Sequence, residues 1–559
     1  MQATKPSRAC QVVSSDHAAM FKVSCREVLQ GIVPPHGVRC VRKERYKRDR
    51  VQVLPIQFLG ARRSTQQSKG QHYISMLGVD ITYSSGSRVF FTLVTILPAC
   101  AAQILSYVIN IGIRPRCSNV SFSHPNATLG ACLSSSRGNL FANTLYAIGD
   151  ESLTFGSEKR DVDFKWGTDM IRGVNIGGWL VLEPWITPSI FDNANRNRPQ
   201  KDIVDEYTLA EKLGPDAALA VLRKHWDTFV TWQDFNKIKQ AGFNIVRIPI
   251  GYWAYDTLDS PYITGAAVYI DAAVDWARLL GLKIVIDLHG APGSQNGYDN
   301  SGQRLDVPTW QTGDTVKQTL QVLKTISDKY AQPSFQDVVV GIQILNEPAQ
   351  YWEDKIKLDV TKQFYRDGYG QVREVSDTPV ILGDGFMPPS SWNGFLTPSD
   401  GSALNVAMDH HEYQIFDNKF IKWSPAQHID YVCTNADTYN GADKWTFVGE
   451  WTGAMTDCAR YLNGYGRGAR YDGTLNNAPK IGNCGWQNDI KQWSQSYKDE
   501  TRKYIEAQIS AFENKTQGWF WWNFKTESAA EWDAFDLIDA GVFPAIKNGK
   551  VDYHFKTKC

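Results

Sequence analysis

Hydrophobic and polar positions alternate in a regular way from residue 171 to the end of the chain. Nearly continuous apolar runs, each predicted to be a buried strand, span residues 171–176, 244–250, 283–289, 338–347, 380–386, 403–413, 444–451 and 518–527. Stretches with helical spacing separate several of these runs, at residues 232–241, 266–280, 315–330 and 492–514. Apolar strands that alternate with helices predict a parallel sheet covered on both faces. Eight such strands favour a closed (β/α)8 TIM barrel over an open doubly wound sheet.

The segment before this region has a different pattern. Residues 89–113 contain no charged side chain over 25 positions, which is long enough to span a bilayer. The segment also has the parts of a secretory signal, namely Arg88, an apolar run, and the small residues Ala99-Cys100-Ala101. We expect residues 76–102 to be a signal-peptide-like segment. A membrane anchor at residues 89–113 is the alternative.

Met76 lies where the initiator of such a signal would be expected, 12 residues before Arg88. Residues 1–75 show no sustained period, and we interpret them as a disordered or gene-model leader. Lys159-Arg160 resembles a dibasic propeptide cleavage site. We therefore expect residues 103–160 to be a propeptide-like segment and residues 161–559 to be the main domain.

Composition narrows the function of that domain. Aromatic residues make up 12% of the chain, with 19 Trp, which favours a large core or a cleft that binds rings or sugars over disorder. Residues 1–75 hold 14 Lys and Arg against 4 Asp and Glu, whereas residues 161–559 hold 39 against 51. An acidic main domain argues against nucleic acid as a partner.

The ten cysteines have no metal-finger spacing, and we expect no metal site. Six precede residue 161, and the even four that follow are suited to two disulfides in an exported protein. Sequons at Asn119, Asn126 and Asn514 agree with export. No Gly-rich dinucleotide fingerprint follows the first strand and no Walker sequence is present, so we expect no nucleotide cofactor.

Polar side chains gather at the predicted carboxyl ends of the strands, where barrel enzymes place their chemistry. They are Arg247, Asp287, His289, Asn346, Glu347, His410, His411, Glu412, Tyr413, Glu450 and Trp522. Each alone has an ordinary structural explanation, such as a core ion pair, a satisfied buried histidine or a packed ring. Their common position at strand ends favours a functional set.

Glu347 and Glu450 are a candidate catalytic pair. They end the predicted fourth and seventh strands, which lie on opposed parts of an eight-strand barrel mouth. Cleavage of a glycosidic bond needs two such carboxyls, because one protonates the leaving oxygen while the other captures or stabilises the positive sugar carbon. This chemistry needs no cofactor.

The whole constellation resembles glycoside hydrolase family 5, and more narrowly the fungal secreted exo-β-1,3-glucanases. The resemblance covers residues 164–559 and rests on six motifs. These are RGVNIGGWLVLEPWITPSIF (172–191), DLHGAPGSQNGYDNSG (287–302), ILNEP (344–348), DHHEYQIF (409–416), VGEWTGAMTDCA (448–459) and WWNFKTE (521–527).

The resemblance implies a role for each matching residue. Glu347 is expected to be the general acid/base and Glu450 the nucleophile, with Arg247 and Tyr413 beside Glu450 to keep it ionised. Asn346 is expected to bond the sugar 2-hydroxyl. The remaining roles are sugar-hydroxyl binding or carboxylate orientation by His289 and His411, hydroxyl binding by Glu183, an apolar platform from Trp522, and a clamp for the next sugar from Tyr298 and Phe416.

Two positions depart from the family pattern. Tyr298 stands where Phe is usual, which keeps the ring and adds a hydroxyl, and Phe524 stands where Trp is usual. The sequence does not decide whether Phe524 affects a sugar subsite or only packing. The family's disulfides carry over as Cys433–Cys559 and Cys458–Cys484.

The resemblance implies a secreted, monomeric enzyme that hydrolyses β-1,3-glucan, a polysaccharide or oligosaccharide partner, from its non-reducing ends. Release of β-glucose by double displacement is expected, with transglycosylation as a side activity. The alternatives are a β-1,6-glucanase or β-glucosidase of the same family, and a non-catalytic wall-binding protein on the same scaffold.

Overall fold

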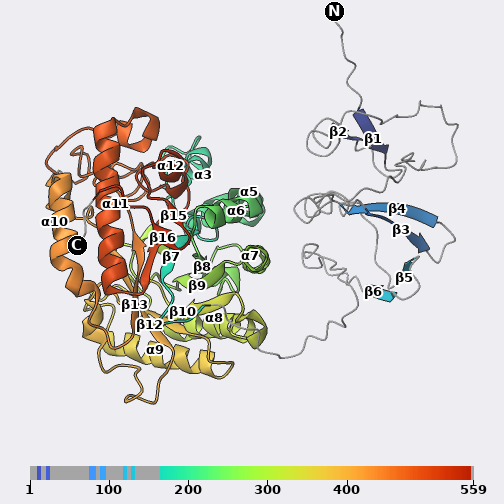
Figure 1. The fold of residues 1–559 in the computed structure, drawn as a ribbon, viewed down its shortest axis with the longest axis horizontal. Coiled ribbons are helices and arrows are strands. Elements are labelled where there is room, and N and C mark those ends of the chain that lie inside the picture. Colours follow the sequence, from blue (N-terminus) through green and yellow to red (C-terminus); the bar gives the residue numbers. More distant parts are fainter. Residues whose placement is uncertain are drawn as a thin grey trace, which may run out of the picture. The chain divides into compact units, whose positions relative to one another are not determined.

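The computed structural model describes residues 164–476, 478–555 and 559, together with six strands nearer the amino terminus (Figure 1). The chain divides into two compact units, Met1–Tyr146 and Ala147–Cys559. The strands of the first unit are β1 (Ala9–Val13), β2 (Met20–Ser24), β3 (Ser75–Thr82), β4 (Arg88–Thr95), β5 (Ser118–Phe122) and β6 (Thr128–Ala131). β1 pairs with β2, and the others form an antiparallel sheet in the order β4-β3-β5-β6.

The signal-like and propeptide-like segments, 76–102 and 103–160, lie outside the described residues except where β3 to β6 cross them. Their processing therefore stays a prediction. In the described part of the chain, no helix combines the length and the apolar character needed to cross a membrane.

The second unit is a closed barrel of eight parallel strands, which confirms the predicted (β/α)8 fold. The strands are β7 (Ile171–Asn175), β8 (Ile245–Gly251), β9 (Lys283–Gly290), β10 (Val339–Gln343), β11 (Val380–Gly383), β12 (Val406–Glu412), β13 (Trp445–Trp451) and β14 (Gly518–Trp521). Each strand pairs with its sequence neighbour, and β14 pairs with β7 to close the ring. Each of the eight lies within, or overlaps, one of the predicted apolar runs.

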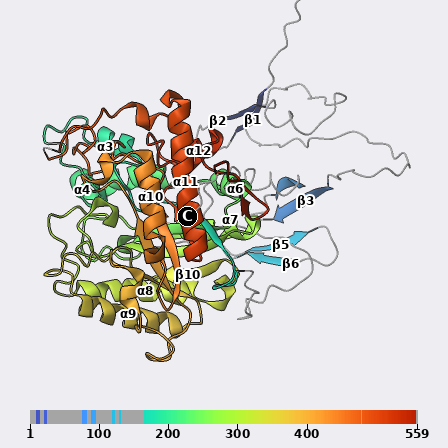
Figure 2. The ribbon, with the colours of Figure 1, turned by 60° about the vertical axis from the view of Figure 1, so that its left-hand side comes forward.

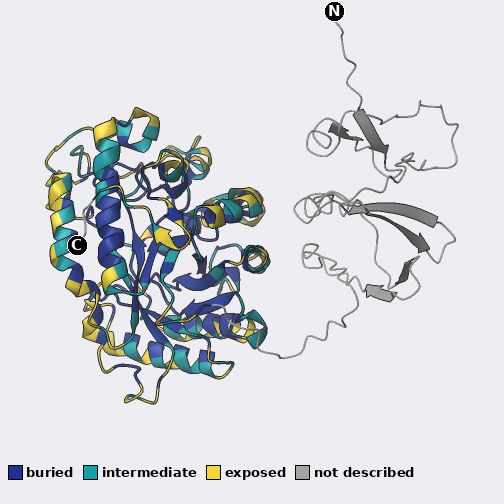
Figure 3. Cartoon of the chain, in the orientation of Figure 1, coloured by how far each residue is buried: buried dark blue, intermediate teal, exposed yellow. Residues whose placement is uncertain are grey.

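Helices surround the barrel, buried on the side that faces the strands and exposed on the other (Figures 2 and 3). They are α3 (Pro188–Ala194), α4 (Glu206–Leu213), α5 (Pro215–Phe229), α6 (Trp232–Gln240), α7 (Ala267–Leu280), α8 (Thr315–Tyr330), α9 (Leu358–Arg373), α10 (Pro425–Asn435), α11 (Gln495–Lys515) and α12 (Ala534–Asp539). A short hairpin of β15 (Ile546–Lys547) and β16 (Lys550–Val551) follows.

Local chemistry explains where the predicted helices begin and end. α6 starts with a capping box, in which Thr231 and Asp234 satisfy each other's backbone amides. The hydroxyl of Ser494 caps α11 by accepting from the amide of Tyr497. α7 ends at Gly281, whose φ of +65° is a left-handed cap that glycine adopts without strain.

The barrel interior is apolar at the amino ends of the strands. One side chain from each strand packs there: Ile171, Ile245, Val285, Val340, Ile381, Ala407, Phe447 and Phe520, with Phe164 against them. Above this ring the interior turns polar, with Arg247, Asp287, Gln343, Asp409 and Glu450 all buried. The polar layer therefore lies toward the carboxyl ends of the strands, over an apolar floor.

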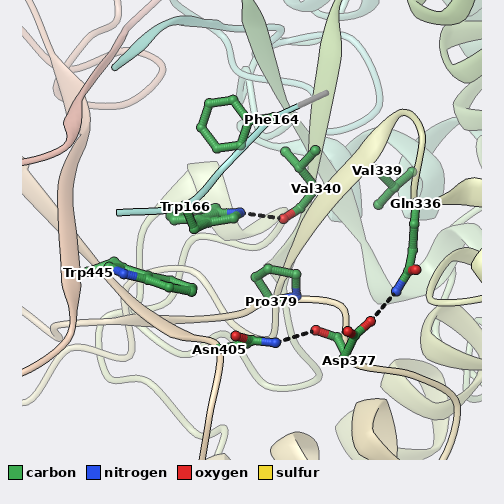
Figure 4. A pocket seen from close by; sticks show the side chains of 9 residues that line it. All are labelled: Phe164, Trp166, Gln336, Val339, Val340, Asp377, Pro379, Asn405 and Trp445. Carbon is green, nitrogen blue, oxygen red and sulfur yellow. Dashed lines mark hydrogen bonds between the residues drawn. The ribbon is translucent and has the colours of Figure 1, made fainter. Parts of the chain in front are cut away.

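A cavity of about 190 Å³ opens at the amino ends of the strands, beneath that floor. Trp166 and Trp445 stack at its edge, and the Trp166 indole donates to the Val340 carbonyl (Figure 4). Barrel enzymes place catalysis at the opposite, carboxyl end of the strands. The active site is therefore expected at the other mouth of the barrel.

Several strands end sooner than the apolar pattern predicts. β10 stops at Gln343 and β14 at Trp521, so Asn346, Glu347 and Trp522 lie on the loops that follow rather than on the strands. The backbone of Glu347 has φ +44°, in the left-handed region, which no strand residue adopts. Hydrophobicity continues past the strand ends because these loops pack inward over the barrel.

Both expected disulfides are present, Cys433–Cys559 and Cys458–Cys484. The first joins α10 to the last residue of the chain. Asn514, the sequon residue within the described part of the barrel unit, is exposed near the carboxyl end of α11.

Candidate active site

The two candidate carboxylates meet at the carboxyl end of the barrel. Glu450 lies on β13 and Glu347 on the loop after β10, and both are buried. An oxygen of one lies within 4.8 Å of an oxygen of the other, and a ring nitrogen of His411 lies within the same distance of both. The structure thus brings together two acids that are 103 positions apart in the chain.

Glu450 is held by three partners. Arg247 Nη1 donates to Oε1 at 3.0 Å, and the Tyr413 hydroxyl donates to Oε2 at 2.9 Å. His411 Nδ1 lies 3.5 Å from Oε2. The expected contacts of Arg247 and Tyr413 are present, but they do not hold the acid's pKa low. Burial raises the pKa of Glu450 above its usual value, against the opposing charges of His411 and Arg247.

Glu347 is held by a histidine and two amides. His411 Nδ1 lies 2.8 Å from Oε1, while Asn296 and Asn300 donate to Oε2 at 3.2 and 3.1 Å. Burial alone would raise the pKa of Glu347. The hydrogen bond and charge of His411 outweigh burial and leave the pKa of Glu347 below its usual value.

His411 stands between two carboxylates. Its Nδ1 faces Glu347, and its Nε2 lies 3.1 Å from Asp409 Oδ2. Both ring nitrogens can donate only when His411 is an imidazolium. When Glu347 and Asp409 are both ionised, His411 therefore carries a proton that it shares with them. Burial alone would lower the pKa of His411, but Glu450 and Asp409 raise it well above its usual value. The arrangement stores a proton next to Glu347.

Arg247 on β8 is the centre of the polar layer. Its guanidinium is completely buried and contacts the carboxylates of Asp287, Asp409 and Glu450 at 3.1, 3.6 and 3.0 Å. Its nitrogens also donate to Gln343, Asn175 and Asn346. A buried cation is stable only with such compensation, and the three carboxylates raise its pKa against the effect of burial.

A second histidine, His289, contacts Asp287, Asn346 and Trp522. His289 Nδ1 lies 2.6 Å from Asp287 Oδ2, and its Nε2 lies 3.5 Å from the Asn346 amide nitrogen. The ring stacks on Trp522, with centroids 5.6 Å apart. Since Asn346 also accepts from Arg247, its amide is oriented with nitrogen toward His289.

The other predicted sugar contacts surround this centre. Glu183 is buried, accepts from the Trp185 indole at 2.9 Å, and has a pKa raised well above its usual value by burial and by Asp299. Tyr298 and Phe416 are about half exposed on the loops after β9 and β12. Phe416 packs edge-on against Tyr413.

Phe524 lies in the core. It is completely buried between Phe229 and Phe535, with ring centroids 5.6 and 5.9 Å away. The sequence did not decide whether Phe524 affects a sugar subsite or only packing. In the structure, Phe524 contributes to packing.

Sequence reasoning missed several members of the site. Asn296 and Asn300 bind Glu347, while Asn175, Gln343 and Asp409 surround Arg247. Asp409 opens the motif that contains His411, so its position in the sequence was a usable signal. Asn296 and Asn300 lie in the motif at residues 287–302, which was also a usable signal, but apolar periodicity does not show where its loop places them.

Within the described residues, the one group of side chains placed to hold a metal ion is Glu347, His411 and Glu450. His411 already contacts both carboxylates, and Arg247 adds a positive charge 3.0 Å from Glu450. The arrangement can hold Glu450 ionised beside Arg247 and supply a proton to Glu347 from His411. Both carboxyl groups can then act on one atom of a bound molecule.

Comparison with known proteins gives consistent results. Residues 212–528 match the model of the cellulase family, glycosyl hydrolase family 5. A glucan 1,3-beta-glucosidase of Blumeria graminis is 46% identical over 71% of this chain and 92% of its own length. A glucan 1,3-beta-glucosidase of Schwanniomyces occidentalis is 46% identical over 69% and 90%, and a probable glucan 1,3-beta-glucosidase A of Neosartorya fischeri is 48% identical over 70% and 90%.

A solved structure, rutinosidase from Aspergillus niger, has the same fold. Its TM-score is 0.53 at 21% identity, with 68% of this chain and 99% of that chain covered.

Proposed function

The chain belongs to glycosyl hydrolase family 5, and from that premise we propose that it is a retaining exo-β-1,3-glucanase. It hydrolyses β-1,3-glucan from the non-reducing ends and releases glucose. Relatives that are 46–48% identical to it over 90–92% of their own length are named glucan 1,3-beta-glucosidase or probable glucan 1,3-beta-glucosidase A. The observation that carries the proposal is the approach of Glu347 and Glu450 to within 4.8 Å. Retaining enzymes separate their carboxyls by about 5–5.5 Å, and inverting enzymes by about 6.5–9.5 Å.

In the first step, Glu450 attacks the anomeric carbon of the terminal glucose. The bond between that carbon and the glycosidic oxygen breaks, and the oxygen takes a proton from Glu347. The shortened glucan leaves, and glucose remains joined to Glu450 as an ester. Arg247 and Tyr413, which bond the two oxygens of Glu450, fix the direction of attack.

In the second step, water attacks the same carbon from the side that the glucan has left. Glu347 takes a proton from the water, the ester bond breaks, and Glu450 recovers its charge. Two inversions leave the β configuration. Because the intermediate is covalent, a sugar hydroxyl that replaces water gives transglycosylation.

The proton that Glu347 donates is held jointly with His411. Their 2.8 Å hydrogen bond allows the proton to sit on the imidazole in the empty site and on the carboxyl when the leaving oxygen arrives. This sharing reconciles a lowered pKa of Glu347 with its role as an acid, because the pair carries the proton rather than either group alone.

The remaining side chains bind the sugar. Asn346, oriented by Arg247, faces the 2-hydroxyl, and Glu183 takes hydroxyls of the terminal glucose. Trp522, braced by His289, offers its ring to the apolar C–H face of that glucose. Tyr298 and Phe416 hold the next sugar at the entrance.

Initial rates on laminarin, pustulan and an aryl β-glucoside test the linkage. We expect laminarin to give the highest kcat/KM, with β-glucose as the first product seen by NMR. A preference for pustulan would favour the β-1,6 alternative, and α-glucose as first product would exclude retention.

Replacement of the nucleophile separates the enzyme from a non-catalytic wall-binding protein. Glu450→Gln keeps the size and shape of the side chain and one of its two acceptor oxygens but removes the nucleophile, and we expect turnover to fall by about 10³-fold or more. Glu374→Gln, at a side chain that is 67% exposed, is the matched control and should leave turnover unchanged. Unchanged turnover in Glu450→Gln would refute the assignment.

We also propose that the protein is a monomer and is secreted to the medium or the cell wall. Secretion is supported by the two disulfides and by the exposed sequon at Asn514. Amino-terminal sequencing of the secreted protein tests it. We expect a start after Lys159-Arg160, whereas a start before residue 76 would contradict the processing scheme.

A further inference from the structure

The end of β12, which carries His411, has an incomplete ladder on one side. The register between β11 and β12 ends at Gly383 opposite Asp409, and the amide of Asp384 then donates to the Asp409 carbonyl at 3.0 Å. On the other side, the register with β13 shifts by one residue between His410 and His411. Such a shift disrupts ladder hydrogen bonds locally. Side chains are therefore left to fix His410 and His411 on the β11 side.

A buried ion pair provides that contact. His410 Nδ1 lies 2.5 Å from Asp384 Oδ2, and Asp384 is buried. Asp384 Oδ1 accepts from the amide of Phe386 at 2.9 Å, so both oxygens of the carboxylate are bonded. His410 also faces Glu412, whose Oε2 lies 3.7 Å from its Nε2, and Tyr439, whose ring centroid is 5.6 Å away.

The bond between His410 and Asp384 joins opposite charges. Burial alone would lower the pKa of His410, but the charges of Asp384 and Glu412 raise it to about 9. The ring is therefore a cation at neutral pH. A charge-assisted hydrogen bond of this kind is shorter and stronger than one between neutral groups, which suits it to fix a strand end.

The ion pair lies on the outer face of β12. Consecutive side chains of a strand point to opposite faces of the sheet. His411 faces the barrel interior, where its Nδ1 lies 2.8 Å from Glu347 Oε1. His410 therefore faces outward, toward Asp384 in the loop after β11. A ring held on the outside fixes the backbone of β12 at this point, and with it the direction in which His411 enters the site.

The loop that carries Asp384 also contacts the loop of Glu347. The carbonyl of Gly385 accepts at 3.2 Å from the amide of Gln350, three residues after Glu347. Asp384 and Gly385 line a small cavity together with Glu347 and His411. One loop thus contacts both members of the pair that shares the catalytic proton.

We propose that Asp384 and His410 are positioning residues, and that their ion pair keeps His411 within hydrogen-bonding distance of Glu347. They act through His411 and do not touch the sugar. His410 thereby gains a role that its place among the polar side chains at strand ends did not reveal. This inference rests on the proposed function, because the proton that Glu347 gives to the leaving oxygen is shared with His411.

Dependence on the leaving group tests the inference. Laminarin needs a proton on its leaving oxygen, whereas 2,4-dinitrophenyl β-glucoside releases a stable phenolate without one. For the full chain, we expect His410→Ala to lower kcat/KM for laminarin about tenfold or more, and kcat/KM for the dinitrophenyl glucoside less than about threefold. A general loss of folded enzyme would lower both by the same factor. His554→Ala, at an exposed histidine, is the control and should change neither.

A milder substitution carries the test if His410→Ala does not fold. Asp384→Asn keeps the shape of the side chain, removes its charge, and leaves one acceptor oxygen for the two donors His410 and Phe386. We expect kcat/KM to fall about three- to tenfold on laminarin and less than about twofold on the dinitrophenyl glucoside.

His410→Asn separates the contact from the ring. Its amide nitrogen takes the place of Nδ1 and can still donate to Asp384, so we expect kcat/KM for laminarin to stay within about threefold of the unaltered protein. A fall as large as that of His410→Ala, an equal fall of His410→Ala on both substrates, or no fall on laminarin in folded variants would overturn the positioning role. If the unaltered protein hydrolyses neither substrate, the proposed function itself fails, and the two failures are distinguished.

Discussion

Replacement of Asp409 by Asn should move the pH profile of the enzyme to lower pH. Asp409 is buried, and its Oδ2 lies 3.1 Å from His411 Nε2. Asn has the same shape, and an amide oxygen in the place of Oδ2 can still accept from both Gln343 and His411. The substitution therefore removes one negative charge with little change in packing.

The magnitude follows from the distance. Opposite unit charges 3.1 Å apart attract by about 5 kcal/mol at an effective dielectric constant of about 20. At about 1.4 kcal/mol per pKa unit, this attraction sets a ceiling of about four units. Relaxation reduces this shift, as does the amide oxygen that still accepts from His411, and we expect the pKa of the His411–Glu347 pair to fall by about one to three units.

Both the alkaline and the acid limb of the pH profile should move to lower pH. Activity is lost on the alkaline side when the shared proton leaves, and a lower pKa brings that loss to lower pH. On the acid side, Glu450 must be ionised, and burial raises its pKa. Removal of the nearby negative charge of Asp409 eases ionisation of Glu450, so the acid limb also moves down.

The assay is kcat/KM on laminarin from pH 3 to 9, since this ratio reports the ionisations of the free enzyme. Asp437→Asn removes the same charge from a side chain that is 88% exposed and should leave both limbs in place, because solvent screens it. Thermal unfolding of both variants checks the fold. If Asp409→Asn is folded and its alkaline limb stays in place or moves to higher pH, the idea that His411 and Glu347 share a proton is refuted.

Three further substitutions test the packing of the site, of a helix and of the core. Gly449→Ala should destabilise the protein by about 1–3 kcal/mol or more in thermal unfolding, since the added carbon would lie 1.8 Å from Asp409 Oδ1. Gly370→Ala, within α9 and with no atom near the added carbon, should instead stabilise it by about 0.5–1 kcal/mol, and similar effects at both sites would contradict this account. Phe524→Trp should cost about 1–3 kcal/mol of stability by overpacking and leave KM for laminarin unchanged, whereas a changed KM would place Phe524 at a sugar subsite.

The barrel was predictable because its strands are buried on both faces and therefore apolar throughout. Each of the eight runs contains a strand or overlaps one, and the helices at α6, α7, α8 and α11 follow their predicted spans within three residues at each end. Strand ends were less predictable. The apolar pattern continues through Ile344 and Leu345, which are buried, although β10 ends at Gln343.

The candidate site divides in the same way. The side chains at strand ends, such as Arg247 and Glu450, were identified because parallel strands deliver their last residues to one mouth. Asn296 and Asn300 were not, although they lie in the motif at residues 287–302, because their positions depend on how the loop after β9 folds back over that mouth. Nor could the sequence give the net ionisation of Glu450, which depends on how strongly burial opposes Arg247 and His411.

The interior of the barrel has consequences for how this protein can change over time. The ring of apolar side chains from Ile171 to Phe520 occupies one end of the strands, and the charged cluster around Arg247 occupies the other. Thermal tolerance and substrate preference are therefore controlled from opposite ends of the same eight strands. Evolution or protein engineering could therefore adapt the enzyme to a new polymer by changing the loops at the carboxyl ends of the strands, without changing the apolar ring at the amino ends.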